Sequence, residues 1–219
     1  MARSRTDRRG PPRGEQRREA LLVALDELLR DNGGRLEAVD IAEISRRAGL
    51  TRSAFYFYFE NKAAAVGAAL EDIYQEVFAV NDILVGPGEP ADRIERTIRG
   101  LVDFWDRHRH LYSAVLDARS ASAAVREIWE SERQAFIPSI AAMIDDERRA
   151  GRAPAGGDAA TLADVLLLLN ERLLERLTLG AELDRERYIE SVVTVWLRSI
   201  YAPAEPTTAR NRYDSAPSA

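Results

Sequence analysis

One stretch, residues 49–62, holds the side chains best suited to chemistry. It carries Arg52, five successive aromatic residues and, at its end, Lys62, the only lysine of the chain. On a helix, Arg52 and Tyr56 would share one face, and Tyr58 would flank that face. Guanidinium, phenol and ammonium groups are typical contacts to the phosphates of nucleic acid. The pattern therefore predicts phosphate contacts; the alternative is ordinary packing of the tyrosines, with an exposed, solubilising lysine.

The position of Lys62 suggests an anion in particular. Asn61 can cap a helix, which places Lys62 in its first turn, where a cation opposes the helix dipole by about 0.3–1 kcal/mol. A phosphate bound there would satisfy both the lysine and the free backbone N–H groups. We therefore expect Lys62 to contact a phosphate.

The residues before this stretch predict how it is held. Asp40, with Glu43 three residues later, resembles a capping box that opens a short helix over 41–48. Gly49 can take the positive φ of a tight turn, and Thr51 can cap the helix that follows. Two short helices joined in this way are typical of a helix-turn-helix. The alternating aromatics 55–59 could also form a strand, but the chain offers no partner strand.

The amino-terminal part of the chain is locally basic. Residues 1–62 hold twelve arginines and one lysine against ten acidic residues, although the whole chain has a net charge of -5. A basic end on an acidic body suits local phosphate contact with weak non-specific binding. We expect residues 1–14 to be a disordered basic arm, which in an alternative reading lies along DNA. Residues 15–62 would form the helix-turn-helix domain, beginning with a helix over 16–32.

The pattern of residues 63–202, which would form the second domain, predicts helices throughout. The helix that begins at Lys62 keeps an apolar stripe until a Gly-Pro-Gly break at 86–88, so one long helix would join the two parts. Further apolar stripes are found at 94–105, 112–116, 125–144 (with a kink at Pro138), 162–179 and 189–201. The sequence thus predicts an all-α fold of about nine helices, with a disordered tail at 203–219.

The last two helices are expected to be an interface. Residues 162–179 are apolar nearly all round, and such a helix must be covered on every side. We predict a homodimer through segments 161–179 and 185–201, arranged as a four-helix bundle. The alternative is that the same chain covers the outward leucines.

The composition of the chain and its apolar runs limit the cellular locations and cofactors that we expect. The chain has no cysteine, and purely apolar runs such as 165–169 are far too short to span a bilayer. The charged amino terminus has no apolar segment like that of a signal peptide. We expect a cytoplasmic protein with no membrane partner and no cofactor.

The motifs together resemble the TetR/AcrR family of bacterial transcriptional regulators. The resemblance rests on the capped helix, on Ala48-Gly49-Leu50-Thr51, on the aromatics 55–59 and on Asn61-Lys62. It implies a homodimer with a DNA-binding head on double-stranded operator DNA and a helical body for a small, mainly apolar effector. It also implies base-reading or phosphate roles for six residues: Thr51, Arg52, Ser53, Tyr56, Tyr58 and Lys62.

A mycobacterial subgroup of that family is especially similar. The shared residues are the aromatics 55–59, Trp129, Asn170-Glu171-Arg172, Trp196 and Ser199-Ile200-Tyr201. Its ligand channel is long and aromatic, with asparagine as polar anchor, which implies ligand contacts here for Phe104, Trp105, Trp129, Phe136, Asn170 and Trp196. A second channel asparagine of the subgroup corresponds to Leu167, so the same ligands are not implied. Without the resemblance these aromatics are core, and Asn170 is a satisfied buried amide.

Signals of catalysis are missing. His108 and His110 lie two residues apart, so on a helix they face different ways and do not form a metal pair; we expect them at the surface, near a helix end. We therefore predict no metal site and no enzyme. Two rivals to a ligand-responsive repressor stay open: a helical sensor or carrier that does not bind DNA, and an all-α enzyme that uses the same cavity.

Overall fold

The computed structural model describes residues 13–180 and 184–202, and every regular element within them is a helix. Ten α-helices and one 3-10 helix succeed one another: α1 (Arg13–Asp31), η1 (Leu36–Ala38), α2 (Ile41–Arg47), α3 (Arg52–Tyr58), α4 (Lys62–Val85), α5 (Pro90–Arg107), α6 (Arg109–Ala121), α7 (Ala123–Gln134), α8 (Ile137–Arg149), α9 (Ala159–Thr178) and α10 (Arg185–Tyr201). The predicted all-α class is confirmed. The predicted tail 203–219 and the predicted arm lie outside the described residues, except that Arg13 and Gly14 open α1.

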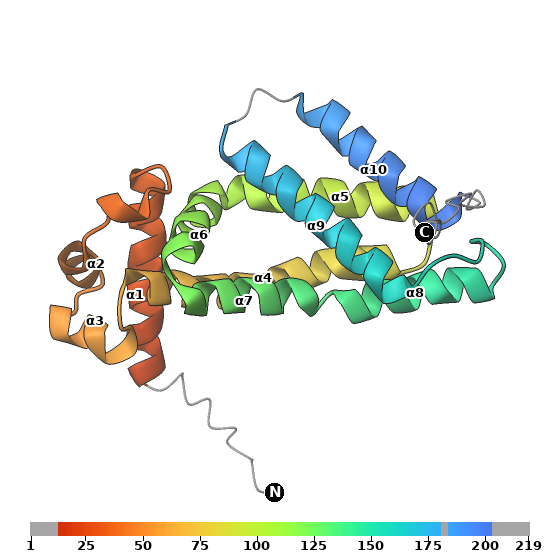
Figure 1. The fold of residues 1–219 in the computed structure, drawn as a ribbon. Helices are drawn as coiled ribbons and strands as arrows, with labels where there is room; N and C mark the ends of the chain where they lie inside the picture. Colours follow the sequence, from red (N-terminus) through yellow and green to blue (C-terminus); the bar gives the residue numbers. More distant parts are fainter. Residues whose placement is uncertain (1–12, 181–183, 203–219) are drawn as a thin grey trace, which may run out of the picture.

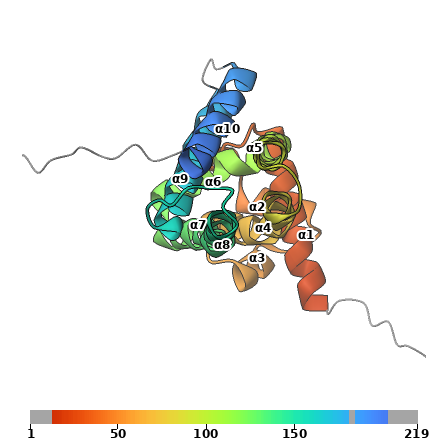
Figure 2. The same ribbon diagram turned by 90° about the vertical axis from the view of Figure 1, so that its right-hand side faces the viewer.

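The helices form a small head and a long body (Figure 1). Helices α1 to α3 make the head at one end, and α4 runs from the head along the body. Figure 1 shows α7 and α8 following the course of α4, with α5 above them and α9 and α10 crossing on the outside. Figure 2, which looks along the body, shows α10 and α9 projecting on the side away from α1.

Apolar periodicity explains the main packing of the head. Leu21, Leu25 and Leu28 recur at helical spacing on α1, and all three are buried, as the stripe predicts. Helix α1 packs against α2, α4 and α6. Since α6 belongs to the body, the head is attached to it by more than the continuous α4.

The region predicted as one kinked helix over 125–144 is two helices, and this accounts for ten helices instead of about nine. Helix α7 ends at Gln134 and α8 begins at Ile137, with Pro138 in its first turn. Proline is well tolerated there, because the first N–H groups of a helix have no intrahelical partner. Pro138 therefore starts a new helix and does not bend an existing one.

The turn that follows α1 lies very close to α6. Gly34 has a φ of 80°, and a Cβ atom built on it would lie 2.6 Å from Ser113 Cβ and 2.8 Å from the carbonyl oxygen of His110. A larger residue would force the two segments apart. Glycine at this position thus permits the contact between head and body.

Candidate functional site

Local hydrogen bonds fix the starts of α2 and α3. Asp40 Oδ1 accepts from the Ala42 N–H at 3.0 Å, and Thr51 Oγ1 accepts from the Ala54 N–H at 3.2 Å, so both predicted caps are present. Gly49 has a φ of 69°, as the turn requires. The capping box is incomplete, because the Glu43 carboxylate binds Arg46 at 2.6 and 2.8 Å.

Helix α3 is fixed by one face and presents the other to solvent. Phe55 and Phe59 are buried, with ring centroids 5.6 Å apart, and they anchor the helix to the head. Arg52 and Tyr56 lie on the outer face, as their spacing predicts. Arg52 Nη2 donates to Tyr56 Oη at 3.2 Å, and the guanidinium carbon lies 5.7 Å from the centre of the tyrosine ring. This contact holds a cation and a phenol together on an exposed surface.

The other residues expected at this surface differ in exposure. Thr51 and Ser53 are exposed, whereas Tyr58 is half-buried and packs against the core. Sequence reasoning gave no role to Phe57, which is the most exposed large apolar side chain of the described residues, at 81%. The signal was available: Phe57 lies two positions from each buried phenylalanine, and on a helix this spacing points it away from the core.

Lys62 does not have the arrangement expected from the sequence. Its ammonium group donates to the carbonyl oxygens of Leu36 at 2.8 Å, Val39 at 2.6 Å and Glu37 at 3.4 Å. These carbonyls belong to η1 and to the residue that ends it, and the Leu36 oxygen also accepts from the Val39 N–H at 3.2 Å. An ammonium group has three donors, so Lys62 is used internally and ties the start of α4 to the head. The structure thus gives Lys62 an internal role that the sequence did not indicate, and the phosphate contact stays a prediction.

The expected surface position of the histidines is wrong for His110. His110 is buried, and its Nε2 lies 2.7 Å from Asp26 Oδ1 on α1. The hydrogen bond from His110 lowers the pKa of Asp26 below its ordinary value, although partial burial acts in the opposite direction. Partial burial lowers the pKa of His108, which lies between α5 and α6. The pair Asp26–His110 is a second polar link between head and body.

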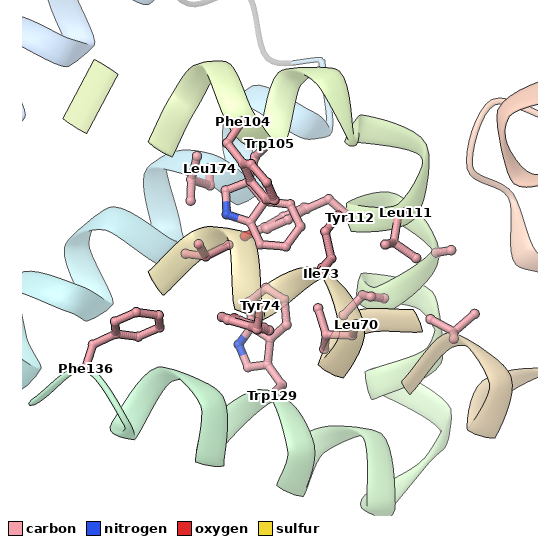
Figure 3. Close-up of a cluster of buried hydrophobic side chains, with 14 of the residues drawn as sticks. Leu70, Ile73, Tyr74, Phe104, Trp105, Leu111, Tyr112, Trp129, Phe136 and Leu174 are labelled. Carbon is pink, nitrogen blue, oxygen red and sulfur yellow. The ribbon is translucent and has the colours of Figure 1, made fainter. Parts of the chain in front are cut away.

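An aromatic cavity of about 90 Å³ lies in the body. Of the residues implied by the resemblance, five line it: Trp105, Trp129, Phe136, Asn170 and Trp196. Figure 3 shows Trp105, Trp129, Phe136 and two tyrosines, Tyr74 and Tyr112, around this part of the core. Burial raises the pKa of both tyrosines well above the ordinary value, so their hydroxyls are neutral. Both tyrosines also line the cavity, and sequence reasoning did not assign them to it.

Phe104 does not line the cavity. It is buried beside Trp105, with ring centroids 5.2 Å apart and planes nearly perpendicular, and its ring packs on His108 at 4.7 Å. Adjacent residues of a helix point about 100° apart, and at this place on α5 only Trp105 reaches the cavity. The expected ligand contact of Phe104 is therefore replaced by a packing role.

Polar groups occur at a few places in the cavity wall. Trp196 Nε1 donates to Asn170 Oδ1 at 3.1 Å, so the amide oxygen is satisfied by the protein. Within the described residues, Trp129 Nε1 and Thr97 Oγ1 are buried without a hydrogen-bond partner. A buried polar group without a partner costs about 1–3 kcal/mol. The cavity thus holds polar groups that an entering molecule could satisfy.

The outer sides of α9 and α10 carry exposed apolar residues. Val165 and Leu168 on α9 are 56% and 46% exposed, and Val195 on α10 is 43% exposed. These three residues, here called the α9–α10 face, lie on the helices predicted to form an interface. The described segments next to them leave these side chains exposed. Among the described residues, no helix is both long and apolar enough to cross a membrane.

The folded head and the helical body together define a class, the helix-turn-helix transcriptional regulators. Residues 21–69 match the family profile of bacterial regulatory proteins of the TetR family, and residues 94–202 match that of the C-terminal domain of transcriptional regulator EthR. The chain is 31% identical over 196 residues to the HTH-type transcriptional regulator EthR of Mycobacterium tuberculosis, covering 87% of this chain and 89% of that protein. The chain belongs to the TetR family of bacterial transcriptional regulators.

Other relatives agree with this assignment. EthR of Mycolicibacterium smegmatis is 28% identical over 202 residues, which cover 90% of this chain and 92% of that regulator. The crystal structure of a TetR-family regulator from Streptomyces coelicolor has a TM-score of 0.64 at 25% identity, covering 84% of this chain and 80% of that one. A Rhodococcus sp. structure of the same family has a TM-score of 0.66 at 19% identity, covering 85% of this chain and 99% of that one. These relatives are transcriptional regulators, not enzymes.

Proposed function

We propose that this TetR-family regulator is a ligand-responsive repressor that binds operator DNA as a homodimer and is released by a small, mainly apolar molecule. The observation that carries the proposal is the course of α4. Its first residue, Lys62, is bonded to the head, and further along the same helix Tyr74, Val77 and Leu84 line the cavity. One rigid element therefore connects the two candidate sites.

The DNA contacts would come from α3 and the turn before it. We assign base or phosphate contacts to Thr51, Arg52, Ser53, Tyr56 and Tyr58. Arg52, which is hydrogen-bonded to Tyr56, is the one cationic residue of α3. Helix α3 contains no carboxylate that would repel a phosphate. Each protomer would place this helix in the major groove of one half-site.

The effector would bind among the cavity residues Trp105, Trp129, Phe136, Asn170 and Trp196. A cavity of about 90 Å³ is small, because sites for small organic ligands usually have about 300–1,000 Å³. A ligand must therefore displace the walls, and α4 supplies part of them. The effector releases DNA only if it prefers the arrangement of α4 that does not fit the operator; a coupling of about 1–3 kcal/mol is enough.

Dimerisation would use α9 and α10. The α9–α10 face offers exposed apolar side chains on two long helices, and two such pairs can form a four-helix bundle. This arrangement would hold the two heads at a fixed separation, which a palindromic operator requires.

Binding to the upstream region of the chain's own gene tests the proposal. The full chain should shift that duplex as a dimer, and the affinity should fall linearly with the logarithm of the salt concentration. An Arg52→Gln variant should bind more weakly to all sequences, with a salt slope reduced by about 0.9 for each half-site. A folded dimer that binds no duplex, either from the upstream region or from a random pool, would refute DNA binding and favour a sensor or carrier.

A further inference from the structure

Phe57 is exposed in a manner that packing does not explain. Its side chain is 81% exposed, whereas its neighbours at positions 55 and 59 are buried. The next most exposed large apolar residue of the described chain, Leu179 at 65%, lies at the end of a helix, whereas Phe57 lies within α3. A folded head gains nothing from a phenylalanine at this position.

The ring of Phe57 is nevertheless held in a defined orientation. It meets Tyr58 edge-on, with ring centroids 5.0 Å apart and planes at 84°. Tyr58 is half-buried and packs on the core, and the Gly14 position on α1 approaches its hydroxyl. A ring supported in this way presents a fixed apolar surface to an approaching partner.

The surroundings of Phe57 are polar and contain no acid on α3. Ser53 lies one helical turn before it, and the Arg52–Tyr56 pair lies beside them on the outer face. A purely apolar partner would remove water from the Arg52–Tyr56 pair and offer it no hydrogen-bond partner in return. A polyanion that also carries an apolar group fits the whole face.

The major groove of DNA has such a group. Most base edges in the groove are hydrogen-bond donors or acceptors, and the methyl group at C5 of thymine is the apolar exception. A phenylalanine cannot donate or accept a hydrogen bond, so it distinguishes bases only through contact with this methyl group. We propose that Phe57 is a specificity residue that reads the methyl group of a thymine in each operator half-site.

The inference rests on the proposed operator binding, and a test with uracil separates the two. Deoxyuridine has the hydrogen-bonding pattern of thymidine without the methyl group, so each thymine of an operator selected by the full-length wild-type chain can be replaced in turn. Replacement of thymine by uracil at one symmetric pair of positions should weaken binding by about fourfold per half-site, which corresponds to the loss of one buried methyl group.

A variant then assigns that sensitivity to Phe57. Phe57→Ala should bind thymine and uracil equally at this pair of positions, while retaining measurable affinity at low salt through its phosphate contacts. Val23→Ala is the matched control, because Val23 is an exposed apolar residue of the same head on α1, and this variant should keep the full uracil effect. Circular dichroism checks that both variants are folded.

Two results would overturn the inference while operator binding itself stands. One is a wild-type chain that is insensitive to uracil at every thymine. The other is an unchanged uracil effect in Phe57→Ala; if that variant also has a changed oligomeric mass without DNA, the ring contacts a second copy of the chain instead. Failure of the wild-type chain to bind any duplex would refute the proposed function, not the role of Phe57 alone.

Discussion

Replacing Lys62 by methionine should destabilise the protein in the absence of DNA. The substitution keeps an apolar side chain of similar shape but removes the donor to three carbonyls. Two of these bonds, at 2.6 and 2.8 Å, reach half-buried oxygens, while the third, at 3.4 Å, is exposed and weak. Charge-assisted hydrogen bonds contribute about 1.5–3 kcal/mol each. Since Lys62 is only half-buried, we use the lower value and expect a loss of about 3 kcal/mol.

That loss can be measured as a change in Tm. For a protein of this length, 1 kcal/mol corresponds to about 2–4 °C, so the expected decrease is roughly 6–12 °C. Thermal unfolding followed by circular dichroism, without DNA, is the assay. Arg52→Met is the matched control, because it also removes a cation near the expected DNA surface, but one that is exposed; its midpoint should not change.

The outcome distinguishes two roles for Lys62. A lysine used only for phosphate contact would leave the melting temperature of the free protein unchanged when replaced. If Lys62→Met has the same Tm as the wild-type protein, the internal bonds do not stabilise the head, and the predicted phosphate contact is the remaining role for Lys62.

Three further predictions concern the link between head and body, the cavity and the α9–α10 face. The pKa of Asp26 is lowered in the folded state, so its contribution to stability is present above the ordinary value of 3.8 and is lost as the pH falls through the lower folded value. Asp26→Asn should therefore lose less stability than the wild-type protein on acidification, measured by urea unfolding from pH 5 to 2. Thr97→Val replaces a buried hydroxyl without a partner by a methyl group, and should raise the free energy of unfolding by about 1 kcal/mol in the same assay; a decrease would mean that the hydroxyl has a partner such as a bound water. Val165→Glu combined with Leu168→Glu should yield folded monomers in sedimentation experiments, whereas a dimer of unchanged mass would place the interface elsewhere.

Local chemistry made much of the head predictable. Asp40, Gly49 and Thr51 act on residues within four positions of themselves, so their caps and turn can be inferred from neighbouring sequence. The burial of Phe55 and Phe59 follows from helical periodicity in the same way.

Contacts between distant segments could not be predicted in this way. The carbonyls that bind Lys62 lie 23–26 residues earlier in the chain, and Asp26 lies 84 residues before His110. No periodicity connects such positions. The predicted lining of the cavity was wrong at Phe104 for a different reason. Phe104 and Trp105 are both apolar and both buried, and only the packing of neighbouring helices decides which of them faces the cavity.

In the proposed mechanism, the length of α4 would convert a small change at the cavity into a large one at the DNA. Its 24 residues span about 36 Å at 1.5 Å per residue. A tilt of about 5° at the cavity end would move the head end by about 3 Å, and two protomers tilting in opposite directions would change the distance between recognition helices by about 6 Å, against a half-site repeat of about 34 Å. The helix would act as a lever arm, so the walls of the cavity would need to move far less than the heads.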